Sequence, residues 1–257
     1  MPEQEAAVPK IETEKNKVHQ SPIDITRAIV RRDKSLKGKV LRVDYHKGDV
    51  DTITIEDEGF LATTKDGADS CIIASHLKSG DYRLWQFHMH WGHNAHDGSE
   101  HCIGSKRFAG EIHCVFWNKN LGSREEALKH CDGFTVLAIF VDEAEEDNPN
   151  LAPVITAIDQ ALEADDRKAP ISADFDLSHL LPEKHSYYTY DGSLTTAPFA
   201  ECVTWTILHR HIPIGRAQLA VLRKITDRNV RQPQKLHDRE VHASFRYAHV
   251  AQHGHLP

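Results

Sequence analysis

The sequence has 257 residues, a net charge of −7 with neutral histidines, and 40% hydrophobic residues. A mildly acidic chain is poorly suited to nucleic acid or an anionic membrane surface, so we expect neither as a partner. The length suits one large domain, and no shift in composition divides the chain. We therefore expect a single domain over residues 18–257, preceded by a flexible polar tail over residues 1–17.

The cysteines and the N-terminal stretch indicate the compartment. The five cysteines are odd in number and scattered in spacing, which does not favour a disulfide framework or a C-x-x-C metal site. The N-terminal stretch lacks the apolar core of a signal peptide, and no apolar run approaches the length of a membrane span. We expect a reduced, cytoplasmic protein without membrane contact, and we expect it to be a monomer.

The first half of the chain has the patterns of β-strands. Alternating residues predict strands at Val40–Tyr45 and Thr52–Ile55. Two longer apolar and aromatic runs follow, Leu84–Trp91 and Gly110–Trp117, and a glycine-containing loop joins them. These two runs are predicted to be buried strands.

The second half adds helices around a further strand. We expect helices at Ser123–His130, which begins with a capping serine, at Asn148–Glu163, which has an apolar stripe, and at Ala217–Lys224. The apolar run Gly133–Val141 is typical of a buried strand. The whole pattern predicts a mainly β (α+β) domain, built on a mostly antiparallel sheet with short peripheral helices.

Histidines are concentrated in the two long apolar runs. His88 and His90 are two residues apart, so in a strand they point to the same face, and Glu111 and His113 share a face in the same way. If the strands pair, His88, His90 and His113 can converge on one point. Three neutral imidazoles that leave a fourth position open are typical of a catalytic zinc ion. The sequence therefore predicts one Zn²⁺ per chain.

Other histidine pairs do not have this setting. His209 and His211, and the C-terminal HGH motif, lack an acidic partner and a third histidine on a neighbouring strand, so we expect no metal there. The predicted zinc stretch also contains Glu100 and His101, and burying so many ionisable groups without a purpose would be costly. A purely structural hydrogen-bonded cluster is the alternative interpretation.

Several segments in this order resemble one family. QFHMHWG, GSEH and GEIHCVFWN resemble the zinc-site motifs of the α-class carbonic anhydrases. The resemblance continues in QSPIDI at Gln20–Ile25, in the SLTT-x-P segment within Leu180–Trp205, and in NVRQPQ at Asn229–Gln234. It implies a large twisted ten-stranded sheet with a zinc cleft. The implied activity is reversible hydration of carbon dioxide to bicarbonate by attack of zinc-bound hydroxide, with anions and sulfonamide-type compounds as inhibitors.

The resemblance also assigns roles to individual residues around the three zinc-binding histidines. Thr195, hydrogen-bonded to Glu100, orients the nucleophile, and the backbone N–H of Thr195 holds a substrate oxygen. The acceptors that orient His88, His90 and His113 are, in that order, Gln86, the backbone carbonyl of Asn229, and Glu111. The residues that match the substrate pocket are Val115, Val136, Leu194, Thr196, Val203 and Trp205.

Two departures from the family pattern concern the rim of the site. The family's aromatic N-terminal segment is absent from this sequence. Fast members carry a proton-relaying histidine where this chain has Phe60, which cannot relay a proton and is expected to pack at the rim. Glu58, His93 and His96 are the alternative relays. We therefore expect proton transfer to be slow or dependent on buffer.

Three other functions are weighed against this one. A catalytically weak or silent carbonic anhydrase-related binding module is favoured by the absent N-terminal segment, although all three histidines are present. An ester hydrolase could use the same zinc ion, but the bulk of an ester argues against a narrow apolar pocket. A zinc-storage or structural protein would leave Thr195 and Glu100 without a purpose.

Overall fold

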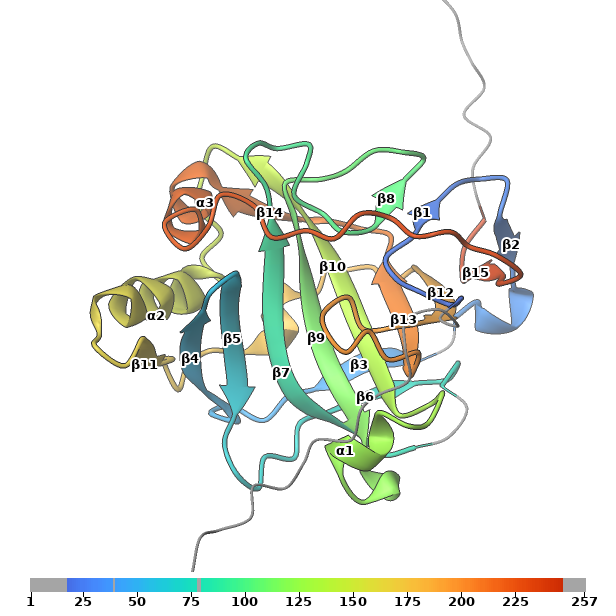
Figure 1. Cartoon of the computed structure of the whole chain (residues 1–257), viewed down its shortest axis with the longest axis horizontal. Helices are drawn as coiled ribbons and strands as arrows, with labels where there is room; N and C mark the ends of the chain where they lie inside the picture. Colours follow the sequence, from blue (N-terminus) through green and yellow to red (C-terminus); the bar gives the residue numbers. More distant parts are fainter. Residues whose placement is uncertain (1–17, 39, 78–79, 247–257) are drawn as a thin grey trace, which may run out of the picture.

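The structure of the chain is a computed structural model that describes residues 18–246 except 39 and 78–79. The expected tail over residues 1–17 and the C-terminal HGH motif lie outside the described residues. Within the described part, thirteen strands form one twisted sheet, and β1 (Asp24–Ile25) pairs with β8 (Cys102–Ile103) in a second, small sheet (Figure 1). The mainly β fold with few helices that the sequence predicted is confirmed.

The large sheet has a main path of ten strands, counted over the described residues. In order they are β11 (Lys168–Pro170), β4 (Val50–Glu56), β5 (Gly59–Thr64), β7 (Tyr82–Trp91), β9 (Gly110–Asn118), β10 (Phe134–Ala144), β13 (Val203–Leu208), β12 (Tyr187–Gly192), β15 (Val241–Ala243) and β2 (Val30–Arg32). Three further strands pair beside this path: β3 (Leu41–Asp44), β6 (Cys71–Ala74) and β14 (Ile212–Gly215). The expected ten strands are therefore corrected to thirteen in the described part, because three short strands add to the main path.

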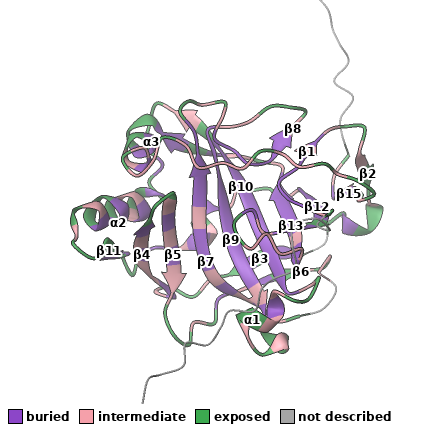
Figure 2. Cartoon of the chain, in the orientation of Figure 1, coloured by how far each residue is buried: buried purple, intermediate pink, exposed green. Residues whose placement is uncertain are grey.

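Most neighbouring strands of the sheet are antiparallel, as expected. Parallel pairs occur between β10 and β13, between β10 and β14, and between β15 and β2, so the sheet is mixed. The central strands β7, β9 and β10 are buried along most of their length, as Figure 2 shows. Strands covered on both faces have nearly continuous apolar sequences, so the few polar residues among them have specific partners.

Short helices lie at the periphery of the sheet. The α-helices are α1 (Arg124–Ala127), α2 (Ala152–Glu163) and α3 (Arg216–Leu222), and 3-10 helices occur at Lys34–Leu36, Lys119–Leu121 and Leu177–Leu180. Figure 1 shows α2 and α3 together at one side of the sheet, and α1 below β9. No helix of the described residues is long and apolar enough to cross a membrane.

Helix bounds differ slightly from the predicted ones for local reasons. Helix α2 begins at Ala152 instead of Asn148, because the Asn148 side chain accepts a hydrogen bond from the backbone N–H of Asn150 in a preceding turn. Pro153 then lies in the first turn, where a missing N–H costs nothing. Helix α1 begins after the predicted cap Ser123, whose hydroxyl accepts from the backbone N–H of Glu126.

Candidate metal centre

The pairing of β7 with β9 brings the predicted histidines together. His88 lies directly opposite His113 in the antiparallel register, and His90 lies opposite Glu111. The ring centroids of the three histidines are 4.7–5.3 Å apart. One nitrogen from each ring lies within 4.8 Å of the others. The three imidazoles therefore converge on one point.

Each of the three rings places its other nitrogen against an acceptor. The contacts are Nδ1 of His88 to Oε1 of Gln86 at 2.9 Å, Nδ1 of His90 to the carbonyl oxygen of Asn229 at 2.8 Å, and Nε2 of His113 to Oε1 of Glu111 at 2.9 Å. A neutral imidazole that donates from one nitrogen offers the lone pair of the other. These contacts therefore leave Nε2 of His88, Nε2 of His90 and Nδ1 of His113 facing the common centre.

The environment favours the neutral form of His88 and of His113. Burial, followed by the neighbouring His90 and His113, holds the pKa of His88 well below its ordinary value. Burial also lowers the pKa of His113, although Glu111 opposes this effect. Because protonated rings cannot bind a metal, low pKa values favour ligation near neutral pH.

Two orphaned atoms show that the centre fits a cation. Nε2 of His90 and Oε2 of Glu100 are buried, 3.4 Å apart, and neither has a hydrogen-bond partner among the described residues. Buried polar atoms without partners are rare, and an ion held by the ring nitrogens would satisfy His90. The cluster formed by the described residues offers three imidazole nitrogens, which suits zinc with one position left open.

A neighbouring cluster of His101, Glu111 and His113 has the same ligand types but another role. Both ring nitrogens of His101 are occupied, by Oε1 of Glu111 at 2.6 Å and by the hydroxyl of Tyr190 at 2.7 Å. Oε2 of Glu111 accepts from the backbone N–H groups of Glu100 and His101. Burial alone would raise the pKa of Glu111, but His101 and His113 hold it well below its usual range. The cluster fixes an ionised Glu111 against His113.

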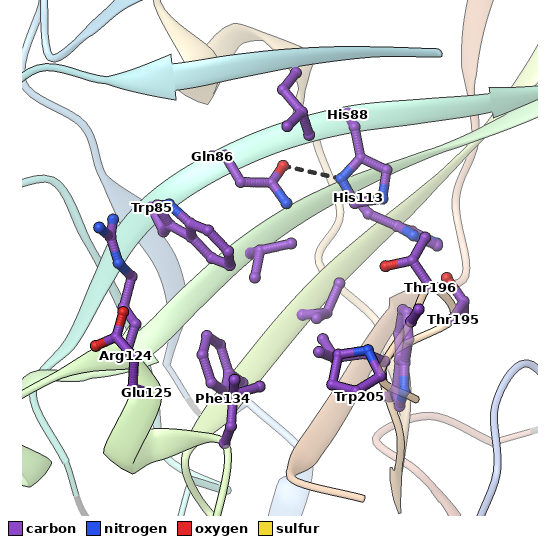
Figure 3. A pocket seen from close by; sticks show the side chains of 17 residues that line it. Trp85, Gln86, His88, His113, Arg124, Glu125, Phe134, Thr195, Thr196 and Trp205 are labelled. Carbon is purple, nitrogen blue, oxygen red and sulfur yellow. Dashed lines mark hydrogen bonds between the residues drawn. The ribbon is translucent and has the colours of Figure 1, made fainter. Parts of the chain in front are cut away.

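Thr195 and Glu100 each lie close to histidines of the triad. Thr195 is buried and lines the same cavity as His88 and His113 (Figure 3). Oε1 of Glu100 accepts from the backbone N–H of Arg231 at 2.8 Å. Since Oε2 of Glu100 has no partner among the described residues, the expected hydrogen bond from Thr195 is not formed in the structure. That oxygen lies 3.4 Å from the unpartnered Nε2 of His90.

The first cavity, of about 320 Å³, opens beside the histidines. Of the predicted pocket residues, five line it: Val115, Val136, Leu194, Thr196 and Trp205. Val203 is the exception, because its side chain is buried in the apolar cluster next to Phe134. Val203 is not among the residues that line this cavity, and its role in the substrate pocket stays a prediction.

The sequence did not indicate the outer wall of this cavity. Trp85, Phe134, Arg124 and Glu125 also line it, and the Arg124 guanidinium lies 5.0 Å from the centre of the Trp85 ring (Figure 3). Strict alternation would point Trp85 away from Gln86. A register shift in β7 between Leu84 and Gln86 changes the alternation there, and no sequence pattern indicated that irregularity.

A second cavity, of about 340 Å³, reaches the histidines from the side of β4 and β5. It shares Leu61, Gln86, His88 and Thr196 with the first cavity. Its other lining residues include His90, Met89, Asn229 and two carboxylates, Glu56 and Glu58. The triad is thus reached from a largely apolar chamber and from an acid-lined chamber.

Phe60 lies deeper than expected. Its ring is 4% exposed, stacks on Trp91 at 6.3 Å and meets Phe87 edge-on at 6.2 Å. It borders the second cavity from within the core, so its expected place at the rim is wrong. The next residue, Leu61, lines both cavities. It therefore supplies the side chain from this part of β5 that faces the triad.

The three alternative relays differ in whether they line a cavity at the triad. Glu58 is exposed and lines the second cavity. His93 and His96 are also exposed, but neither is among the described residues that line the two cavities at the triad. In the HRH pair, His209 stacks on Phe245 at 4.2 Å, and His211 Nδ1 lies 2.9 Å from Oδ2 of Asp142, so the expected lack of an acidic partner is wrong for His211.

Comparison with known proteins agrees with this geometry. The family model described as eukaryotic-type carbonic anhydrase matches residues 6–245. Carbonic anhydrase 1 of Monodelphis domestica is 35% identical over 240 residues, which cover 89% of this chain and 90% of that protein. Carbonic anhydrase 1 of Mus musculus is 35% identical over 239 residues, covering 88% and 90%. Carbonic anhydrase 3 of Homo sapiens is 33% identical over 239 residues, covering 89% and 90%.

Proposed function

Because the chain belongs to the eukaryotic-type carbonic anhydrase family of enzymes, we propose that it catalyses the reversible hydration of carbon dioxide at one zinc ion held by His88, His90 and His113. The convergence of three ring nitrogens beside an apolar cavity carries the proposal. When bound, zinc lowers the pKa of a coordinated water to about 7, a value known for carbonic anhydrases as a class, and so supplies a nucleophile at neutral pH.

Residues behind the triad hold each histidine in its ligating form. The acceptors on Gln86, Asn229 and Glu111 keep the proton on the nitrogen that faces away from the centre. Glu111 is itself held by His101 and two backbone N–H groups, so it cannot swing away from His113. The geometry of the centre is therefore set before any substrate enters.

Thr195 is proposed to orient the nucleophile. In the active enzyme we expect its hydroxyl to donate to Oε2 of Glu100, the buried oxygen that has no partner among the described residues. A hydroxyl whose hydrogen is engaged in this way can only accept from the nucleophile, which then directs a lone pair at the substrate. The backbone N–H of Thr195 holds the substrate oxygen on which negative charge develops.

The apolar cavity suits an uncharged substrate. Carbon dioxide has no charge and no hydrogen to donate, and Val115, Val136 and Leu194 provide an apolar wall beside the triad. Water and carbon dioxide give bicarbonate and one proton. The anionic product is poorly solvated by that wall, which favours its release to water.

Proton removal is proposed to limit turnover. Among the described residues that line either cavity, no histidine occurs outside the triad, and Phe60 offers no acceptor. Each turnover releases a proton, so a rapid cycle needs buffer to take it. This supports slow or buffer-dependent proton transfer in this chain.

A cytoplasmic monomer inhibited by anions and sulfonamide-type compounds is part of the same proposal. The five cysteines are free, as in a reduced compartment. Inhibitors of both kinds would reach the centre through the first cavity. Ester hydrolysis is the second candidate, because a cavity of about 320 Å³ with Trp85 and Phe134 in its wall exceeds what a three-atom substrate needs.

Metal analysis and a single substitution test the proposal together. We expect one zinc per chain, loss of carbon dioxide hydration after chelation, and recovery with added zinc. Thr195→Ala should keep its zinc but lose about 10²-fold or more in kcat/KM, because the hydroxyl that orients the nucleophile is removed while the backbone N–H remains. Thr204→Ala, a similar change outside both cavities, is the control. Zinc-loaded protein without turnover would contradict the proposal and favour the silent binding module.

A further inference from the structure

The second cavity at the triad has its own chemistry. We propose that the carboxylates of Glu56 and Glu58 accept the proton released by carbon dioxide hydration and pass it to solvent, a role that rests on the proposed function. One proton leaves the site in each turnover, binds a carboxylate oxygen, and is then taken by a buffer base. The proton thereby leaves through a different chamber from the one that holds the substrate.

The position of the two carboxylates supports this route. Glu56 ends β4, and Glu58 lies in the turn before β5, so both stand at one end of the β4–β5 hairpin. Both are exposed, and both line the cavity that reaches His88 and His90. Their carboxylates therefore have access to solvent and to the chamber at the triad.

The second cavity also reaches the proposed metal centre. His90 lines it and is 4% exposed, yet its Nε2 has no hydrogen-bond partner among the described residues. The reaction centre and the acid pair are therefore connected by one cavity. The pair differs in this respect from an ordinary acidic surface turn, which has no buried reactive group beneath it.

The chamber can hold the water that proton transfer needs. Its volume of about 340 Å³ is several times the roughly 30 Å³ that one water occupies in the liquid. Gln86, Thr196 and Asn229 line it with polar groups that can hydrogen-bond to water. Water held by these groups would join the triad to the two carboxylates.

Other acceptors are less suitable. Arg124 and Glu125 are the ionisable side chains that the described residues add to the first cavity, and neither borders the second. Hydrogen bonds within the first turn of α1, to its own backbone and to Ser123, lower the pKa of Glu125, which makes it a weaker base. The acid pair is thus favoured by position and by water access.

Kinetics in weakly buffered solution test the route. The double variant Glu56→Gln/Glu58→Gln should have a kcat, extrapolated to zero buffer, that is lower by about tenfold or more. The reason is that a positioned proton acceptor contributes roughly 10²–10⁴-fold to the rate. Concentrated imidazole should restore kcat, and kcat/KM for carbon dioxide should stay within a factor of about two. Asp57→Asn, which removes one negative charge from the same turn outside the cavity, should have no effect.

An unchanged zero-buffer kcat in the double variant would overturn the assignment, as would an equal loss in Asp57→Asn. A second readout does not use turnover: in ¹³C-glutamate-labelled protein, replacing zinc by Co²⁺ should shift the carboxyl signals of Glu56 and Glu58 but not that of the distant, exposed Glu145. Unmoved signals at both positions would also overturn it. If the wild-type protein fails to hydrate carbon dioxide even in concentrated buffer, the proposed function fails instead.

Discussion

Phe60 and Leu61 are adjacent on β5, but only one of the two positions lies where a side chain could relay a proton from the site. Phe60 occupies the position where the family resemblance places a proton relay, but its ring packs on Phe87 and Trp91 in the core. Leu61 faces the triad and lines both cavities. A relay side chain introduced at residue 61 would reach the chamber, whereas one at residue 60 would be buried.

The two histidine variants should therefore behave in opposite ways. Leu61→His should raise kcat at low buffer by about tenfold or more, because an imidazole in the cavity can accept the proton near neutral pH. Phe60→His should give no such gain and should lower the free energy of unfolding by about 2 kcal/mol or more, since a polar ring would be buried without a partner. Stopped-flow hydration and urea unfolding measure the two effects, with Leu61→Asn as a polar control that cannot relay protons. A rate gain in Phe60→His would contradict this placement.

The sequence predicted the convergence of the triad because spacing within one strand decides which histidines share a face. It could not place Phe60, since the face depends on where the preceding turn ends, and a shift of one residue reverses every side chain in a strand. The irregularity beside Trp85 escaped prediction for the same reason. The missing bond from Thr195 to Glu100 depends on side-chain rotation, which no sequence pattern defines.

At the scale of elements, the close pairing of β7 with β9 positions the ligands. Gly110 pairs with Trp91, and a Cβ there would lie 2.5 Å from the carbonyl oxygen of His90 and 2.5 Å from the methyl carbon of Met89. Gly110→Ala should push the strands apart beside His90. We expect a loss of about 1–3 kcal/mol in the free energy of unfolding and weaker zinc binding.

Urea unfolding and competition with a chelator measure those two quantities. Ile112→Val, whose side chain lies in the core cluster, is a matched control that should cost about 0.5–1.5 kcal/mol but leave zinc affinity unchanged. Wild-type zinc affinity in Gly110→Ala would show that the strand spacing does not set the geometry of the triad.

Elements with a long pattern were predictable, and short ones were not. The central strands and helices α2 and α3 have enough residues for a periodicity to emerge, so their positions agree with the sequence to within a few residues. Strands of two to four residues, such as β2, β14 and β15, have no usable period. They form only because distant segments pair, as the parallel pairs of β15 with β2 and of β10 with β14 show.

At the scale of the whole molecule, the half-buried His76, away from the triad, makes stability depend on pH. His76 packs against Tyr187 with ring centres 4.6 Å apart, and its Nε2 lies 2.7 Å from the hydroxyl of Thr206. Burial lowers the pKa of His76 from 6.5 to about 4. The unfolded chain therefore binds a proton at this residue before the folded protein does.

This histidine should weaken the fold as the pH falls from about 6.5 to about 4, with full stability above that window. The total loss is about 3 kcal/mol, at about 1.4 kcal/mol for each pH unit between the two pKa values. Urea unfolding at several pH values measures it. His76→Gln should flatten the curve in this window, and an equally steep curve in the variant would place the acid sensitivity in other groups.

Buffer-limited turnover at the metal centre is tested most directly by one measurement. We would follow carbon dioxide hydration by stopped flow, on protein with verified zinc content, across a series of buffer concentrations. We expect kcat to rise with buffer concentration and then saturate, while kcat/KM for carbon dioxide stays nearly constant. Fast turnover independent of buffer would contradict the proton-transfer limit, and no turnover at any buffer concentration would contradict the enzymatic function itself.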